Sequence, residues 1–173
     1  KSLGILYRAP NLLDEVTLKP LYYSLLLPHL NYCSEIWGNT FKTNLQPIVT
    51  LQKKAVRLIC NANRYEHTTP LFKRLNILKF HDLVKLNTAN TMFKIFHEQM
   101  PRNIQKYFNL KTSKYPQRHL NKFTVGLHRT RVKSPSLSVL GVKTWNDLGN
   151  DLTSITSHVL FKREMKKDSF ARM

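Results

Sequence analysis

The side chains best suited to chemistry in this sequence are cations at helical spacing. In the stretch LQKKAVRLIC, apolar residues recur every three or four positions, while basic residues occupy the other side of the same helix. A row of ammonium and guanidinium groups can follow the phosphates of a nucleic acid. The alternative is a solvated face, but such faces usually mix charges, and no acidic residue occurs between Glu35 and Glu66. The residues predicted to form this row are Lys53, Lys54, Arg57 and Arg64.

A second basic region follows Pro101. No Asp or Glu occurs between Gln99 and Asn146, although Lys and Arg recur throughout. This imbalance favours contact with a polyanion more strongly than the first row does. Aromatic residues among these cations could stack on unpaired bases, although packing in the core is their more common role. They are Tyr107, Phe108, Tyr115 and Phe123. The residues predicted to bind nucleic acid in this region are Arg102, Lys106, Tyr107, Arg118, Lys122, Arg129, Arg131 and Lys133.

The whole chain is strongly basic. Its 173 residues include 28 Lys and Arg against 10 Asp and Glu, which gives a formal net charge of +18. A hydrophobic share of 42% and only 5 glycines are typical of a folded chain with a real core and argue against a disordered tail. Like charges crowded on a compact body repel each other, so an excess of this size predicts a polyanionic partner.

Catalytic carboxylates are not visible in the sequence. Polymerases and nucleases gather two or more carboxylates around divalent metal ions, whereas the acidic residues here are few and scattered and include no adjacent Asp pair. Asp147 and Asp151 could share a helix face, but capping and solvation explain them better. We therefore predict no catalytic residue, no metal ion and no cofactor in this chain.

The two cysteines form no disulfide framework and lack the paired spacing of a zinc site. His29 precedes Cys33 by four residues, which on a helix would place a base beside a thiol; we favour a buried thiol and a packed or capped imidazole. A zinc site assembled from Cys33, Cys60, His67 and a further His stays open as an alternative. A reducing, intracellular setting is the default for such cysteine usage.

Apolar periodicity predicts the helices that must position these residues. A helix over about residues 44–61 would carry the first basic row. A second long helix would run from Asp82 to Met100 and pair Lys94 with Glu98 across one turn. Further helices are expected from Asp14 or Thr17 to Pro28, in a short apolar segment ending at Gly38, from Thr69, within SPSLSVLGVKTWNDL, and in the final segment SHVLFKREMKK.

Local patterns also assign one strand and two buried indoles. The segment FTVGLHRTRV alternates enough to be a strand, which would place Arg129, Arg131 and Lys133 on one side at intervals of about 6.6 Å. Trp37 and Trp145 lie in apolar segments, so we predict that they anchor the core rather than stack on bases.

Four segments of the chain together resemble a known family. LYYSLLLPHLNYCSEIWGN, LQKKAVRLI, HTTPLFKRLNILKFHDL and SPSLSVLGVKTWNDL, in this order and with these gaps, closely resemble the C-terminal part of reverse transcriptases of non-LTR (LINE-type, jockey- and CR1-like) retrotransposons. The resemblance covers about residues 2–167. None of the four segments is a catalytic signature. The palm motif Phe/Tyr-x-Asp-Asp of that family is absent, as is the Cys/His knuckle with which some relatives end.

The resemblance implies a mainly α fold. It predicts a helical thumb-like bundle followed by a basic α-helical C-terminal unit, and the strand pattern allows a small β-hairpin near residues 122–139. The expected segments are a thumb-like region over residues 1–64, a helical connector over 65–101 and a basic C-terminal segment over 102–173. Because the chain opens on KSLGIL without an initiator Met, we expect it to be part of a longer protein.

The resemblance also implies a function without catalysis by this chain. It predicts a segment that holds template RNA, primer or target DNA during target-primed reverse transcription, while Mg²⁺ belongs to the palm, which is missing here. The expected partners are RNA, DNA, and the fingers and palm of the same polyprotein, in a nuclear and cytoplasmic ribonucleoprotein, with no membrane. Two alternatives stay open: a basic helical protein-interaction module that binds no nucleic acid, and a peripheral membrane binder that uses the final helix.

Overall fold

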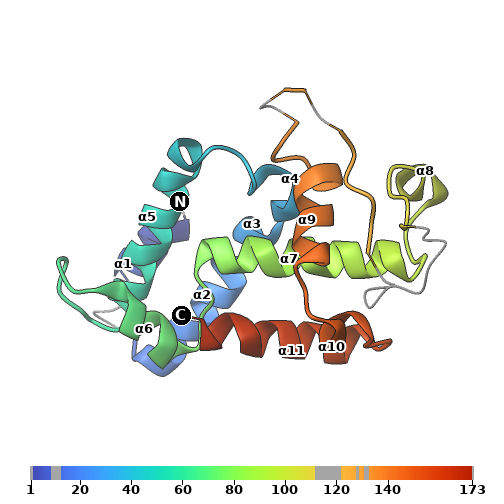
Figure 1. The fold of residues 1–173 in the computed structure, drawn as a ribbon. Helices are drawn as coiled ribbons and strands as arrows, with labels where there is room; N and C mark the ends of the chain where they lie inside the picture. Colours follow the sequence, from blue (N-terminus) through green and yellow to red (C-terminus); the bar gives the residue numbers. More distant parts are fainter. Residues whose placement is uncertain (1, 9–12, 112–121, 128, 131–132, 173) are drawn as a thin grey trace.

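A computed structural model describes residues 2–8, 13–111, 122–127, 129–130 and 133–172. Over these residues the chain is mainly helical, which confirms the predicted fold class (Figure 1). In chain order the elements are α1 (Ser2–Arg8), α2 (Glu15–Leu25), α3 (Leu27–Asn31), α4 (Ser34–Trp37), α5 (Lys42–Ile59), α6 (Thr68–Leu75), α7 (Phe80–Phe96), α8 (Arg102–Gln105), the π-helical turn η2 (Leu137–Gly141), α9 (Val142–Asn146), α10 (Asn150–Thr153) and α11 (His158–Ala171).

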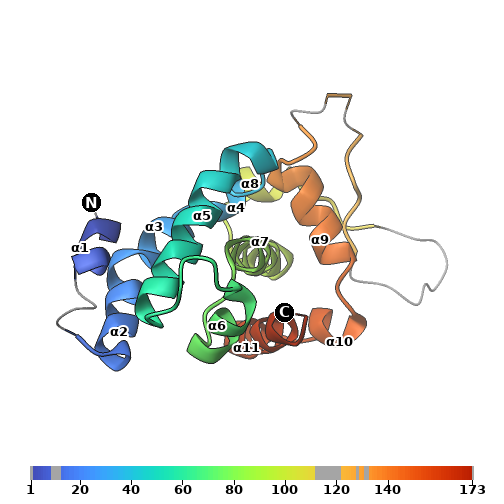
Figure 2. The same ribbon diagram turned by 90° about the vertical axis from the view of Figure 1, so that its left-hand side faces the viewer.

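Helix α7 is the centre of the molecule. Figure 2 shows it nearly end-on, with α4, α5, α6, α9 and α11 arranged around it. It is buried on more than the one face that its periodicity predicted, because Val84, Met92 and Ile95 are buried along with the predicted Leu83 and Phe93. A helix that is apolar on all sides is stable only when other elements cover it. The helices around α7, with the long helix α11 prominent among them, provide that cover.

An aromatic cluster joins the second half of α7 to the C-terminal helices. Phe93 lies 4.7 Å from Phe161 of α11 and 6.5 Å from Trp145 of α9, measured between ring centroids. Trp145 is completely buried, which confirms it as a core anchor. Tilted and edge-on rings of this kind add attraction beyond the area that they bury. Helix α11 runs antiparallel to α7, so its first turn lies beside the last turn of α7 (Figure 1).

A single hydrophobic core crosses the predicted segment boundaries. It extends from Leu6 in α1 to Met165 in α11. The boundaries expected near residues 64 and 101 both fall in connections between helices, and buried side chains pack across each of them. The division into three segments stays a prediction.

A buried amide connects three parts of this core. Gln52 of α5 is 1% exposed, and its Nε2 donates hydrogen bonds to the Tyr22 hydroxyl and to the carbonyl of Leu78, both at 2.9 Å. Its Oε1 accepts a 2.8 Å bond from the backbone N–H of Phe80, which is the first residue of α7. Burial raises the pKa of Tyr22 to about 12, so its hydroxyl remains neutral as it accepts from Gln52.

The second predicted core indole packs against the start of α7. Trp37 stacks on Phe80 at 5.5 Å between ring centroids, and its indole N–H donates to the carbonyl of Tyr32 at 2.6 Å. Gly38 follows directly and ends α4 as predicted. A Cβ at Gly38 would lie 2.6 Å from a methyl carbon of Val84, so close approach of α4 to α7 requires glycine here.

Two helix ends differ from the predictions. Helix α5 ends at Ile59, so Arg64 lies in the following loop and does not extend the row along the helix. Helix α7 ends at Phe96, and Glu98 adopts a left-handed backbone conformation with φ of 56°. The pair predicted between Lys94 and Glu98 is therefore not formed, because Glu98 is outside the helix.

The predicted strand is reduced to one antiparallel bridge between Leu110 and Phe123. On its other side, the amide of Asn146 accepts from the N–H of Phe123 and donates to its carbonyl, both at 2.9 Å. With both backbone groups already bonded, Phe123 cannot pair with a further strand. The segment FTVGLHRTRV is therefore not a strand in its described residues beyond Phe123, and the prediction of a cationic strand face there is wrong.

The final helix is amphipathic, as predicted, and its apolar side is already used. Phe161, Met165 and Ser169 are buried against the rest of the molecule. Val159 and Leu160 of the same helix are exposed, so the peripheral membrane alternative stays open. Within the residues that the structure describes, no helix combines the length and the apolarity required to cross a membrane.

The first turn of α11 contains a buried imidazole nitrogen without a hydrogen-bond partner. Nε2 of His158 is shielded from solvent, and the ring lies 5.5 Å from Phe93. Desolvation, with the nearby charges of Lys94 and Lys162, lowers the pKa of His158 below its ordinary value. The folded protein therefore favours the neutral imidazole.

We predict that Gln52→Leu destabilises the fold by about 2–5 kcal/mol, because the hydroxyl of Tyr22, the carbonyl of Leu78 and the N–H of Phe80 lose their buried partner. Urea denaturation measures this change. Gln46→Leu, which alters an exposed glutamine on the same helix, is the matched control and should change the free energy of unfolding by less than about 0.5 kcal/mol. Equal effects of the two substitutions would contradict the role assigned to Gln52.

We predict that His158 makes the fold less stable in mild acid. Because its pKa is lower in the folded than in the unfolded state, its contribution is fully present above an unfolded pKa of about 6.5 and is lost as the pH falls from there through the folded value. His158→Phe should therefore reduce the loss of stability between about pH 7 and pH 5. Denaturation at several pH values tests this, and parallel profiles for both proteins would contradict it.

Candidate nucleic-acid interface

The first predicted basic row lies on the outer side of α5. Val56 and Ile59 are buried on the core side, whereas Lys54 is exposed and Lys53 and Arg57 are partly buried at the edge. The three cations fall within about 100° around the helix axis, at 100° per residue. The helix therefore presents them together, as the spacing predicted.

Arg57 has a structural bond that its spacing did not indicate. Its Nε and one terminal nitrogen donate to the backbone carbonyl of Glu66 at 3.1 and 2.9 Å. This contact ties the loop after α5 back to the helix. Arg64, in the same loop, is exposed. In this row Lys53 and Lys54 form no ion pair with a described residue, Arg57 holds the loop, and Arg64 lies in the loop.

Beside this row is a cationic depression, which we call the α5–α6 hollow. It encloses about 280 Å³ between α5, the start of α6 and the start of α7. Its polar lining includes Lys53, Lys79, His67, His81 and Thr69, and none of the described residues that line it is Asp or Glu. The ammonium of Lys79 donates to the Thr69 hydroxyl at 3.2 Å. The hollow therefore contains Lys53 from the predicted row and Lys79, which sequence spacing did not predict.

The backbone adds positive potential to the α5–α6 hollow. Helices α6 and α7 both begin there, at Thr68 and Phe80, and the N–H groups of a helix start carry partial positive charge, although the N–H of Phe80 is already bonded to Oε1 of Gln52. Asp82 lies in the first turn of α7, next to the lining residue His81, and burial raises its pKa. Two ammonium groups and two helix starts around one depression suit an oxyanion such as a phosphate.

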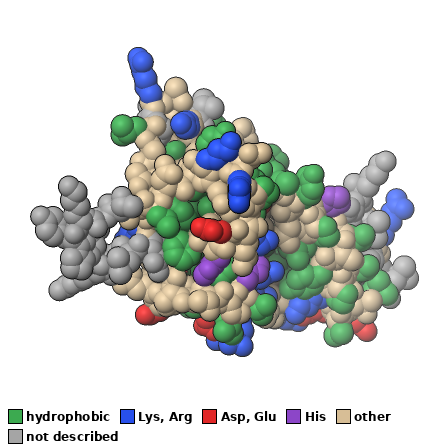
Figure 3. All heavy atoms as spheres, turned by 90° about the vertical axis from the view of Figure 1, so that its right-hand side faces the viewer, with side chains coloured by type: hydrophobic (Ala, Val, Ile, Leu, Met, Phe, Trp, Pro, Cys, Tyr) green, Lys and Arg blue, Asp and Glu red, His purple; other side chains and the backbone are tan. Residues whose placement is uncertain are grey.

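The second predicted region lies at the other end of α7. Arg102, Lys106 and Tyr107 are exposed on and directly after α8, and Lys122 lies on the bridge close by. Figure 1 places α8 and α5 at opposite ends of α7, whose 17 residues extend about 25 Å. The structure therefore does not bring the two predicted regions into one patch. Figure 3 shows this end of the molecule, where Lys and Arg side chains lie in both the upper and the lower half, with a few acidic groups among the lower ones.

The remaining predicted contacts are separated from both groups. Arg129 and Lys133 are exposed in the connection between the bridge and η2. Arg118, Arg131 and Tyr115 lie outside the described residues.

Only one of the described stacking candidates has a freely accessible ring. Tyr107 is 75% exposed, whereas Phe123 is 2% exposed and packs edge-on to Phe108, Phe96 and Trp145. Burial therefore excludes stacking by Phe123, which packs in the core, the role that the sequence analysis gave as the more common one. Tyr107 remains a candidate for a base platform.

Among the described residues, the cysteines and carboxylates do not form the sites considered for them. Across the described residues, no group of three or more His, Cys, Asp and Glu could hold a metal ion. Cys33 is exposed, so the prediction of a buried thiol there is wrong; its backbone, with φ of 48°, turns the chain outward before α4. Cys60 is partly buried, and desolvation raises its pKa. Asp147 and Asp151 belong to different helix ends and share no helix face.

Three cations in hollows were missed by the sequence analysis. Lys79 lies in the connection before α7, outside any helical periodicity. It lines the same hollow as Lys53 only because the tertiary fold brings the two segments together. Lys162 and Lys166 line a second pocket, and their spacing of four residues on the final helix was a signal that could have identified them.

Comparison with protein-family models, with curated proteins and with solved structures gave no match to this chain.

We predict that Arg57→Gln destabilises the fold by about 1 kcal/mol, because the carbonyl of Glu66 loses a charged donor at a partly exposed site. Lys54→Gln, an equal loss of charge one turn away, should change stability by less than about 0.5 kcal/mol. Urea denaturation measures both values, and limited proteolysis of the loop after α5 should be faster only in the Arg57 variant. If the two variants are equally stable and equally resistant to proteolysis, Arg57 does not hold the loop.

Proposed function

We propose that this chain binds nucleic acid through phosphate contacts and performs no chemistry itself. The observation that carries the proposal is the α5–α6 hollow, where Lys53 and Lys79 converge with two helix starts and no described carboxylate lines the site. The exposed Lys54 and Arg64 extend the positive surface beside it. A depression of this charge favours the backbone of a polyanion over a protein surface of mixed charge.

The distribution of ion pairs also supports a polyanionic partner. In the described part of the chain, carboxylates pair with Arg74, Arg163, Lys167 and Arg172, and the other Lys and Arg residues form no ion pair. With a net charge of +18, most of the positive groups are left to solvent and counterions. Release of those counterions is the main driving force when a basic protein binds nucleic acid.

Within this proposal, the resemblance to LINE-type reverse transcriptases supplies the finer assignment. The chain would hold template RNA, primer or target DNA beside a polymerase palm, and bond formation with its Mg²⁺ would belong to that palm. Contacts to phosphate position a strand without reading its sequence, which suits a holding function. Exposed Tyr107 beside Lys106 gives the α8 end the means to engage unpaired bases.

We predict that replacing Lys53, Lys54 and Lys79 together by Gln weakens binding of labelled RNA roughly tenfold or more near 0.1 M salt and lowers the log–log salt slope by about 2–3, one phosphate contact being lost per lysine. Fluorescence anisotropy over a salt series measures both quantities, on single-stranded RNA and on duplex DNA. Arg57 is left intact because it supports the loop.

The matched control replaces Lys73, Lys85 and Lys143 by Gln, which removes the same charge from three exposed positions on three different helices. Its slope should stay close to that of the parent protein. Equal losses in both variants would show that net charge alone matters and would reject the α5–α6 hollow as the site. Absence of RNA binding at about 0.15 M salt would reject nucleic-acid binding itself and favour the protein-interaction alternative.

A further inference from the structure

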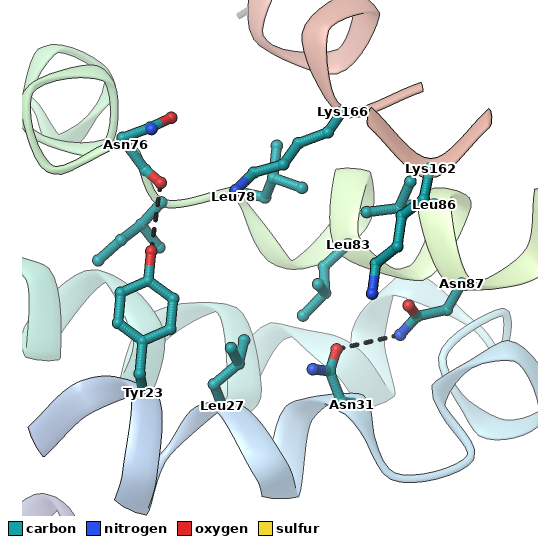
Figure 4. A pocket seen from close by; sticks show the side chains of 11 residues that line it. Tyr23, Leu27, Asn31, Asn76, Leu78, Leu83, Leu86, Asn87, Lys162 and Lys166 are labelled. Atoms are coloured by element: carbon teal, nitrogen blue, oxygen red, sulfur yellow. Dashed lines mark hydrogen bonds between the residues drawn. The ribbon is translucent and has the colours of Figure 1, made fainter. Parts of the chain in front are cut away.

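A second pocket, which we call the α11 pocket, lies on the other side of the α6–α7 connection. It encloses about 200 Å³ between α2, α3, α7 and α11. Much of its wall is aliphatic and includes Leu27, Leu83 and Leu86 (Figure 4). Its polar lining residues come from four helices and from Asn76 in the connection. A largely apolar hollow with a few convergent polar groups is the usual form of a small-molecule or base-binding site.

Two lysines of the final helix reach into the α11 pocket. Lys162 and Lys166 are four residues apart on α11, and Figure 4 shows both side chains extending from that helix across the pocket. The neighbouring Arg163 and Lys167 are held by Glu164, whereas the two pocket lysines have no carboxylate partner among the described residues. The helix therefore directs its ion-paired cations away from the pocket and Lys162 and Lys166 toward it, while the ammonium of Lys166 also lies 5.8 Å from the ring centroid of Phe170.

Opposite the lysines, two amides form a fixed pair. Nδ2 of Asn87 donates to Oδ1 of Asn31 at 3.1 Å and to the hydroxyl of Ser34 at 2.8 Å. This arrangement leaves Nδ2 of Asn31 as a donor and Oδ1 of Asn87 as an acceptor (Figure 4). A donor beside an acceptor complements the edge of a nucleobase, which presents the same two functions side by side.

An aromatic ring completes the pocket. Tyr23 is 37% exposed, and its hydroxyl donates to the carbonyl of Asn76 at 3.3 Å, which fixes the ring at the pocket wall. Bases stack on such rings with little regard to their identity. A bare phosphate would use only the lysines and would gain nothing from the ring, the amides or the aliphatic wall.

We propose that the α11 pocket binds a single nucleotide. Its base lies against Tyr23 and the leucines, its edge meets the amides of Asn31 and Asn87, and its phosphate lies between the two lysines. A base within a duplex is covered on both faces and on its pairing edge, so the pocket takes an unpaired nucleotide. A nucleotide of a single strand and a free mononucleotide share this chemistry. The strand form rests on the proposed function, because it adds one base contact to a phosphate-bound strand.

The test uses the full chain and three probes: nucleoside 5′-monophosphates, the corresponding nucleosides, and inorganic phosphate. Calorimetry gives their affinities, and the side-chain amide signals of Asn31 and Asn87 in NMR spectra report where they bind. We expect monophosphates to bind at least roughly tenfold more tightly than either nucleosides or phosphate, and to shift those two signals. The double variant Lys162→Gln, Lys166→Gln should lose that advantage, and Asn31→Ala should weaken monophosphates without affecting phosphate.

The control variant Arg163→Gln, Lys167→Gln removes the same charge from the same helix outside the pocket and should bind monophosphates like the parent protein. If phosphate binds as tightly as monophosphates, or if both double variants behave alike, the nucleotide proposal is overturned. All four proteins should show the same helical circular dichroism, since the replaced side chains are exposed.

Competition between a labelled single-stranded RNA and monophosphates separates the two sources of nucleotide. If monophosphates displace the RNA from Asn31 and Asn87, the pocket binds a nucleotide of a single strand. If monophosphates bind and RNA does not, the pocket binds a free mononucleotide. If RNA binds with an unchanged salt slope and the NMR signals of these two amides do not shift, this inference is overturned and the proposed function is not. Loss of all RNA binding would instead sink the proposed function.

Discussion

The amide of Gln52 is the interaction on which the arrangement of this molecule depends. It bonds a hydroxyl of α2, a carbonyl of the α6–α7 connection and the first N–H of α7, and all of these groups are removed from water. A buried amide is costly unless every partner is in place, so it favours one arrangement of the three elements over its neighbours. The helix that carries Lys53 and the connection that carries Lys79 are thereby fixed in register.

The same connection separates the two cationic depressions. Its residues Asn76, Ile77 and Leu78 line the α11 pocket, and the next two residues, Lys79 and Phe80, line the α5–α6 hollow. Asn76 ends α6 in the left-handed conformation, which asparagine tolerates well, so the chain turns sharply into this short segment. Because both sites share one rigid connection, a strand bound at one of them lies close to the other.

Local pattern was sufficient for the helices and insufficient for the sites. Periodicity predicted the buried side of α5, one of the buried faces of α7 and the amphipathic character of α11, since that pattern depends only on residues three and four apart. At Phe123 the predicted strand cannot pair further, because the amide of Asn146, 23 residues later, takes both backbone groups of Phe123. The basic row beside Val56 was predictable in the same local way. The approach of Lys53 to Lys79 was not, because it depends on Gln52 and on a tertiary contact that residue spacing does not predict.

The structure separates the residues that stabilise it from those that carry its charge. Stability comes from the aromatic and aliphatic cover of α7 and from the Gln52 amide, while most of the described cations are exposed and unpaired. A chain with so large an excess of one sign loses stability through self-repulsion, and the neutral, closely packed centre around Phe93 and Trp145 offsets that loss. Arg57 is the described cation of the predicted row that serves both purposes, because it holds a loop carbonyl. The unpaired cations are left to solvent and counterions, which is the arrangement that the proposed binding of a polyanion requires.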